Sequence, residues 1–464
     1  ANRNAATPID RLYLSIAMQR LGDSKTATEY RWRLAESLSK YEADADDHNL
    51  PRMHWFAIEP LVVDSPQRAI GLAKASKIPL LSRHIARRLT AEGKLDELVA
   101  AIGESGSAQR ELLYGMREGM DGRDGLKAPA TWQSVYAKLR EQGGEPARTA
   151  LHLSVKFGDE VATRALLETV KKRDADLGDR TQALRGLAER KRAELKKELV
   201  GLLDDQAIRK DAIRAMAAYD DEELARSLLS RYDDLSTDEK LESVITLSTR
   251  SKFGRALTDS IKSGAIPRRD IPAYVARALQ RVVGNGFLEV WGPIEASGGD
   301  KQALFDKYRK LLTEERLADA DLSHGRLLFN RTCQACHRLY GEGGRIGPEI
   351  TGANRTNLDY LLGNILTPSA DIQDSYRMEL VLTDDGRMFS GIPSGEDRWQ
   401  LSLRIANQDE PVKIPKSQIE DRETAKTSMM PEGLLTTLKD DEVIDLIGYL
   451  RHLEQVPLPS LSER

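Results

Sequence analysis

Cys333-Gln334-Ala335-Cys336-His337 is the stretch that most narrowly constrains the fold of this chain, and it contains both cysteines of the 464 residues. Two cysteines separated by two residues and followed at once by histidine have the spacing of covalent haem c attachment. The two thiols add to the vinyl groups of one porphyrin, and the histidine binds the iron from one side. The pentapeptide therefore predicts one covalent haem c, held by Cys333, Cys336 and His337.

Two other uses of this cysteine spacing, a redox dithiol and half of a zinc site, require partners that the sequence does not display. A zinc site needs a second pair of ligands, and a redox dithiol belongs to a thioredoxin-like βαβ unit. With only two cysteines in one short segment, the chain is not a disulfide scaffold either. Haem attachment remains the favoured interpretation.

Composition limits the class of partner and the location. Lys and Arg number 69 against 73 Asp and Glu, a net charge of -4, which argues against a nucleic-acid partner held by bulk charge. No apolar run approaches the roughly 20 residues that cross a bilayer, so we expect no transmembrane segment. The start Ala1-Asn2-Arg3-Asn4 predicts a processed chain or a piece of a longer one, and the haem motif favours a periplasmic or otherwise exported protein.

Helical periodicity dominates the chain from about Arg11 to about Leu317, where apolar residues recur every three or four positions. The clearest candidate helix pairs are 80–102, 147–170, 207–229 and 241–261. Helix pairs of this length are the unit of an α-solenoid. We therefore predict a mainly α protein in which residues 1–320 form a HEAT-like helical-repeat domain without a substrate-oxidising site.

A second domain is predicted over residues 321–464, after a charged helix at 301–317. Within it the apolar period becomes two, which indicates a small antiparallel β-insert at about 374–422 with a hairpin turn at 384–386. The expected strands are 376–382, 388–392, 401–405 and 412–414. Helix returns at about 440–452.

Residues 325–453 resemble the class I cytochrome c family. Gly325 and Phe329 lie ahead of the pentapeptide, where that family packs a small residue and an aromatic against its last helix. Tyr449 is the matching aromatic on the last helix. The resemblance implies a cytochrome c fold in which these three residues meet.

The loop Gly347-Pro348-Glu349-Ile350-Thr351-Gly352 resembles a Gly-Pro loop of the same family. In that family the proline carbonyl accepts the Nδ1 proton of the histidine that binds iron. The resemblance implies that Pro348 orients His337 and raises its basicity.

The sixth iron ligand is expected in Ser428-Met429-Met430-Pro431, just before the closing helix, where class I cytochromes place it. Met430 directly precedes proline, as the family ligand commonly does, and is the predicted ligand, with Met429 as the alternative. The other methionine is expected to pack in the core. A His/Met pair gives a low-spin iron of high potential that passes electrons.

A narrower resemblance covers about the last 140 residues, which look like the haem-binding domain abundant in planctomycetes and verrucomicrobia. It rests on four segments: Tyr360-Leu361-Leu362, Asn364-Ile365-Leu366 with Pro368-Ser369, Asp385-Gly386-Arg387, and 428–435. Residues 46–61 are similar to the middle region of large exported proteins of that group, known as membrane-bound dehydrogenases. Such proteins carry a substrate-oxidising β-propeller ahead of the helical repeats. The resemblance implies a redox partner: that missing propeller domain, or another protein.

Two functions from different classes remain open. The first is a periplasmic cytochrome module that accepts single electrons from a dehydrogenase and passes them to a downstream acceptor. The second is a helical docking scaffold with a haem-based sensor or peroxidase-like site. The iron spectrum separates them, because a stable methionine-ligated iron favours transfer, whereas a CO-binding reduced iron favours sensing.

Polar residues of the helical region carry simpler interpretations. The acidic stretch 44–48 lacks the alternating ligand spacing of a calcium loop, so we predict a solvated, helix-capping turn. Isolated histidines on helical stretches are predicted to be packed or on the surface; they are His54, His84 and His152.

Overall fold

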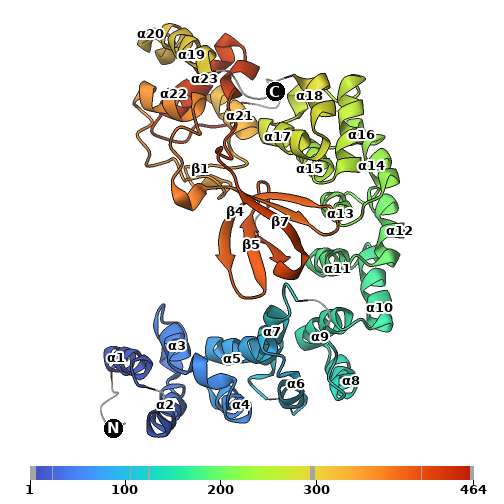
Figure 1. The fold of residues 1–464 in the computed structure, drawn as a ribbon, viewed down its shortest axis with the longest axis vertical. Coiled ribbons are helices and arrows are strands. Elements are labelled where there is room, and N and C mark those ends of the chain that lie inside the picture. The colour runs from blue at the N-terminus through green and yellow to red at the C-terminus, as the bar shows by residue number, and fades with distance from the viewer. Residues whose placement is uncertain are drawn as a thin grey trace. The chain divides into compact units, whose positions relative to one another are not determined.

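The computed structural model is mostly helical and divides into two compact units, Ala1–Arg190 and Lys191–Arg464 (Figure 1). It describes residues 7–22, 24–104, 106–123, 126–292, 298–408 and 410–459. Ala1–Asn4, on which the expectation of a processed chain depends, lie outside these residues. The expected domain boundary at 320 falls inside the second unit and stays a prediction. Among the described residues, no helix has the length and apolar character of a membrane span.

The first unit consists of two rows of stacked helices. Its helices are α1 (Pro8–Gln19), α2 (Lys25–Leu38), α3 (Leu50–Val62), α4 (Pro66–Ala75), α5 (Pro79–Ala91), α6 (Leu95–Gly103), α7 (Gln109–Gly119), α8 (Trp132–Gln142), α9 (Gly144–Lys156), α10 (Glu160–Lys171) and α11 (Leu177–Glu189). Helices α1, α3, α5, α7 and α9 contact one another in succession, and α4, α6 and α8 form a second row. Each helix buries its apolar face only by stacking on its neighbours. The predicted pairs 80–102 and 147–170 are present as α5–α6 and α9–α10; the HEAT-like class stays a prediction.

The acidic stretch 44–48 serves two different purposes. Asp47 Oδ1 accepts hydrogen bonds from the backbone N–H groups of Asn49 and Leu50, both at 2.8 Å, so the predicted capping role at the start of α3 is confirmed. Asp44 is 1% exposed and pairs with Arg11 of α1 at 2.6 Å, so the prediction that this stretch is solvated was wrong for Asp44. Its partner lies 33 residues away, and periodicity could not reveal it.

The three isolated histidines His54, His84 and His152 are packed, which is one of the two predicted outcomes. His54 Nδ1 lies 2.7 Å from the Ser15 hydroxyl, and the His84 ring packs 5.4 Å from the Trp55 ring. Burial, together with a smaller contribution from nearby Arg87 and Arg83, lowers the pKa of His84 to about 4. Burial likewise lowers the pKa of His152 to about 4, assisted by Arg117.

These two histidines predict a loss of stability in mild acid. In the unfolded chain they take up a proton near pH 6.5, whereas in the folded chain they stay neutral until about pH 4. Because the unfolded state then binds more protons, the free energy of unfolding should fall as pH drops through this window. Urea titrations between pH 7 and 4 measure it. Replacing both residues with glutamine should reduce the pH dependence of the free energy of unfolding by up to about two protons. An unchanged pH dependence would contradict the lowered pKa values of His84 and His152.

The second unit begins with further helices in two rows. They are α12 (Ala193–Leu202), α13 (Arg209–Met216), α14 (Glu222–Leu229), α15 (Thr237–Leu247), α16 (Ser251–Lys262), α17 (Ala273–Val283) and α18 (Asn285–Trp291). Helices α12, α14, α16 and α18 contact in succession, and α13 contacts α15. The predicted pairs 207–229 and 241–261 are confirmed as α13–α14 and α15–α16.

The charged helix predicted at 301–317 is two helices, α19 (Gly298–Leu311) and α20 (Glu314–Ala318). The interruption has a local cause, because the Thr313 hydroxyl accepts a hydrogen bond from the Arg316 N–H at 3.3 Å and caps α20. Thr313, which lies between Leu312 and Glu314, is therefore the N-cap of a second helix and not an interior residue of one long helix.

The remaining helices are α21 (Leu322–Thr332), α22 (Leu358–Leu366) and α23 (Asp440–Arg451). Helices α21 and α23 cross at Gly325, where a Cβ would overlap the carbonyl oxygen of Asp445 and lie 2.8 Å from the Tyr449 Cβ. The rings of Phe329 and Tyr449 pack beside this crossing, 5.7 Å apart. The expected meeting of the three residues is confirmed.

The predicted β-insert is a five-stranded antiparallel sheet between α22 and α23, in the order β6-β5-β4-β3-β7. Its strands are β3 (Glu379–Thr383), β4 (Met388–Glu396), β5 (Gln400–Arg404), β6 (Val412–Pro415) and β7 (Ile419–Thr424). The first four match the predicted strands. β7 was not predicted, because its sequence, IEDRET, is charged and mostly exposed. Its pairing with β3 is what identifies it as a strand.

Candidate functional site

The pentapeptide forms a helical turn directly after α21. The Cys333 N–H donates to the Phe329 carbonyl at 2.8 Å, which continues the helix into the motif. The Cys336 and His337 N–H groups both donate to the Cys333 carbonyl, at 3.1 and 2.9 Å. This turn holds both thiols and the imidazole within one short, fixed segment.

His337 is oriented by the Gly-Pro loop. Its Nδ1 lies 2.9 Å from the Pro348 carbonyl oxygen, so the Nδ1 proton is donated there. Burial lowers the pKa of His337, and the hydrogen bond to Pro348 acts in the opposite direction. With Nδ1 engaged, Nε2 is the nitrogen left to bind a metal.

Three glycines let the following loop lie directly on the pentapeptide. A Cβ at Gly343 would overlap the His337 carbonyl oxygen, and one at Gly344 would overlap the Ala335 carbonyl oxygen. A Cβ at Gly347 would lie 2.8 Å from His337 Cε1. Sequence reasoning did not assign Gly343 or Gly344 to the site. The signal was the density of glycines between 341 and 347.

Both thiols are surrounded by apolar side chains. Cys333 packs against the core formed by α21, α22 and α23, and Cys336 packs against a smaller cluster made by Ile346, Ile392 and Ala406. Burial raises the pKa of each thiol to about 12. A redox dithiol needs a lowered thiol pKa, so this environment does not suit one. Half-buried neutral thiols, an imidazole with Nε2 available and a glycine-lined approach fit a covalently held haem.

The two methionines of the 428–431 loop enter different apolar clusters. Met430 packs against the same core as Cys333, whereas Met429 packs against the same cluster as Cys336. The Met430 N–H donates to the Ser428 hydroxyl at 3.1 Å, which fixes the backbone between them. Each methionine therefore shares an apolar cluster with one cysteine, and the choice of Met430 as iron ligand stays a prediction.

The two histidines near the site are engaged elsewhere. His324 Nδ1 lies 2.8 Å from the Asp445 carboxylate, across the crossing of α21 and α23. His452 Nδ1 lies 2.8 Å from the Glu454 carbonyl at the end of α23. Both rings are therefore held by contacts outside the methionine loop.

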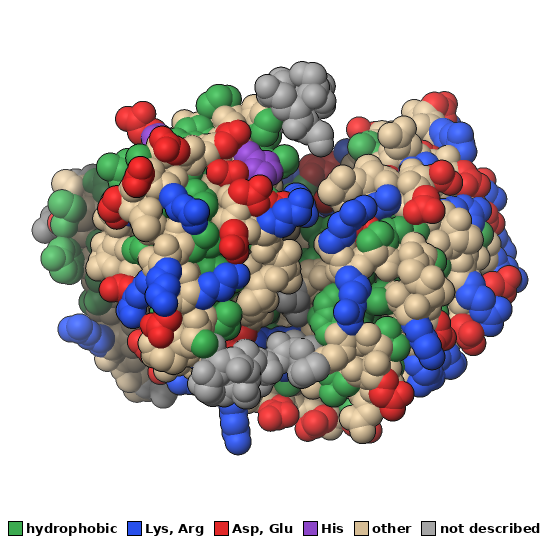
Figure 2. Space-filling model, turned by 90° about the horizontal axis from the view of Figure 1, so that it is seen from above, with side chains coloured by type: hydrophobic (Ala, Val, Ile, Leu, Met, Phe, Trp, Pro, Cys, Tyr) green, Lys and Arg blue, Asp and Glu red, His purple; other side chains and the backbone are tan. Residues whose placement is uncertain are grey.

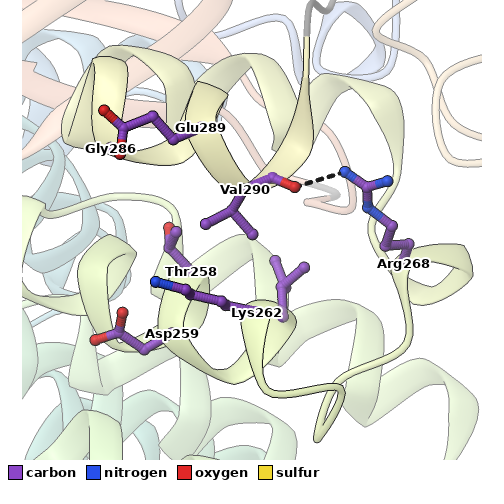
Figure 3. A pocket seen from close by; sticks show the side chains of 8 residues that line it. Thr258, Asp259, Lys262, Arg268, Gly286, Glu289 and Val290 are labelled. Atoms are coloured by element: carbon purple, nitrogen blue, oxygen red, sulfur yellow. Dashed lines mark hydrogen bonds between the residues drawn. The ribbon is translucent and has the colours of Figure 1, made fainter.

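A separate pocket of about 360 Å³ lies between α16 and α18 (Figure 3). Its lining residues are Thr258, Asp259, Ile261, Lys262, Arg268, Gly286, Glu289 and Val290. Arg268 donates to the Val290 carbonyl at its rim at 2.8 Å. None of the lining residues carries sulfur or imidazole, so this pocket is distinct from the candidate haem site.

Charge on the surface is mixed. On the face drawn in Figure 2, the described Lys and Arg side chains are interspersed with Asp and Glu, and neither sign gathers into one broad patch. A charged partner on this face would therefore be recognised by local contacts.

Comparison with known proteins identifies part of the chain. The family model for cytochrome c matches residues 322–454, which run from the first residue of α21 to just beyond α23. No curated protein matches the chain. Residues 322–454 are thus a cytochrome c domain, and cytochromes c bind haem and transfer electrons.

Proposed function

We propose that this chain transfers single electrons through one haem c, attached by thioethers to Cys333 and Cys336 and ligated by His337 and Met430. The haem-binding domain spans 321–464 in this proposal. The hydrogen bond between His337 Nδ1 and the Pro348 carbonyl, directly beside the cysteine pair, is the observation that carries it. When bound, haem supplies a one-electron couple between ferric and ferrous iron.

The residues around the pentapeptide would prepare it for this task. Pro348 holds the His337 ring in the tautomer whose Nε2 faces away from the Gly-Pro loop. Cys333 and Cys336 each pack against a different apolar cluster, which would surround the bound group with apolar side chains. A thioether from Met430 favours the ferrous state, which raises the potential.

The wider setting follows from the sequence resemblance. We propose a periplasmic or otherwise exported protein whose helices over 1–320 form a HEAT-like array. Its electrons would come from a dehydrogenase, either a β-propeller domain of the kind found in planctomycete and verrucomicrobial proteins or a separate redox partner. The haem would pass them to a downstream acceptor. The two-row helix stacking and the cytochrome c match of 322–454 are consistent with this arrangement.

Mass spectrometry and a redox titration test the proposal. Protein matured in a host that exports and assembles cytochromes c should carry the mass of one haem that survives denaturation. A reductive titration should consume one electron per chain, reversibly. Two free thiols in such protein would overturn the proposal, and a reduced iron that readily binds CO would favour a sensor instead.

A further inference from the structure

Helix α17 lies outside the segment that matches cytochrome c, yet one of its faces meets that segment. Tyr274, Arg277 and Arg281 are spaced by three and four residues, so they share one face of the helix. Arg281 Nη1 lies 3.4 Å from the Ser390 hydroxyl of β4, and Arg277 reaches the methionine loop. Both arginines on this face therefore donate hydrogen bonds to the segment that matches cytochrome c.

Arg277 holds the loop that carries the two methionines. Its side chain is buried, and Nη1 donates to the Ser428 carbonyl at 2.6 Å. Ser428 in turn donates its N–H to the Ser369 hydroxyl at 3.1 Å and accepts the Met430 N–H. The backbone immediately before Met430 is therefore anchored by a guanidinium from a helix about 150 residues earlier.

Tyr274, on the same face of α17, contacts a different part of the candidate site. Its ring packs against the cluster of Ile346, Ile392 and Ala406, the same cluster that Cys336 and Met429 contact. Its hydroxyl is shielded from solvent and, among the described residues, has no hydrogen-bond partner. A buried hydroxyl without an acceptor is rare in folded proteins and marks a position where a further group is expected.

We infer that α17 completes the haem site from outside the cytochrome c segment: Arg277 is a positioning residue for the Met430 loop, and Tyr274 covers the apolar cluster that Cys336 contacts, with its hydroxyl donating to the bound group. The inference rests on the proposed function. It makes the helical array part of the redox centre, so residues 322–454 alone would carry an incompletely closed haem.

The experiment compares full-length variants that have been checked for one covalent haem by the pyridine haemochrome spectrum. Arg277→Leu should weaken or abolish the long-wavelength sulfur-to-iron band and speed CO binding to the reduced protein. A hydrogen bond from a charged group changes an equilibrium by about tenfold or more, so the fraction of CO-accessible haem should rise by about that factor. Arg277→Lys keeps a donor and should restore the band.

Arg250→Leu is the matched control. Arg250 is a buried arginine of the same array that donates to the Ala217 carbonyl at 2.7 Å and pairs with Asp385, away from the methionine loop. Its loss should destabilise the protein and leave the band intact. Tyr274→Ala should speed CO binding, whereas Tyr274→Phe should keep the band and lower the midpoint potential.

The outcomes separate the two proposals. If wild-type protein carries no covalent haem, the proposed function fails. If it carries haem and the Arg277 and Tyr274 variants match wild type in band, CO rate and potential, the inference about α17 is wrong while the proposed function stands. An equal loss of the band in Arg250→Leu would also overturn the inference about α17, because the effect of Arg277→Leu would then be general destabilisation.

Discussion

Replacing Met430 with leucine is expected to remove the long-wavelength sulfur-to-iron band, lower the midpoint potential and open the iron to CO. The thioether stabilises the ferrous state, so its loss favours ferric iron. Axial ligands set haem potentials over about 0.8 V, and a fall on the order of 0.1 V or more is expected. Optical spectra, a redox titration and CO binding of the reduced variant measure these effects.

Met429→Leu is the control for this prediction. Met429 packs with Cys336 and Ile346 in the smaller cluster, so its replacement should change packing and leave the band in place. If Met429→Leu abolishes the band and Met430→Leu preserves it, the assignment is wrong by one residue. If neither variant affects the band, electron transfer loses its main support and the sensor function becomes the better proposal.

Gly325→Ala is expected to destabilise the cytochrome c domain strongly. The new methyl group would overlap the Asp445 carbonyl oxygen and crowd Tyr449, and neither backbone can move without separating α21 from α23. Overpacking of this kind costs about 3 kcal/mol, a large share of the stability of a typical domain. Denaturant unfolding followed by helical circular dichroism gives the change in the free energy of unfolding.

Gly363→Ala is the matched control, because Gly363 lies in α22 and a Cβ there meets nothing within 4 Å. This change should be neutral or stabilising by up to about 1 kcal/mol, since alanine favours helix over glycine. Similar destabilisation by both variants would contradict the close crossing of α21 and α23 at Gly325.

Local patterns in the sequence were sufficient for much of the fold. The pairs α13–α14 and α15–α16 and the strands β3 to β6 follow from apolar spacing, because each element buries one face. The break at Thr313 and the strand β7 escaped this approach. A capping hydroxyl and a charged edge strand have no apolar period, so only hydrogen bonds reveal them.

Some residues of the candidate haem site could be predicted from the sequence, and others could not. The two thiols and the histidine lie within five consecutive residues, so their proximity can be read directly from the sequence. The resemblance to class I cytochromes added Pro348, and its carbonyl does lie beside His337. Gly343 and Gly344 required coordinates, because their role depends on how closely the loop approaches the Ala335 and His337 carbonyls.

The sequence by itself predicted haem attachment at the pentapeptide, and it determined the helical character of residues 11–317 and the β-insert, since each depends on residues close together in the chain. Only the tertiary structure showed that α17 reaches this site. Arg277 and Ser428 are 151 positions apart, and an isolated arginine on an amphipathic helix resembles any solvated residue. The segment between them contains α18 to α22 and the β-insert, and its folding back onto α17 depends on burial and packing within the second unit, which no local pattern records.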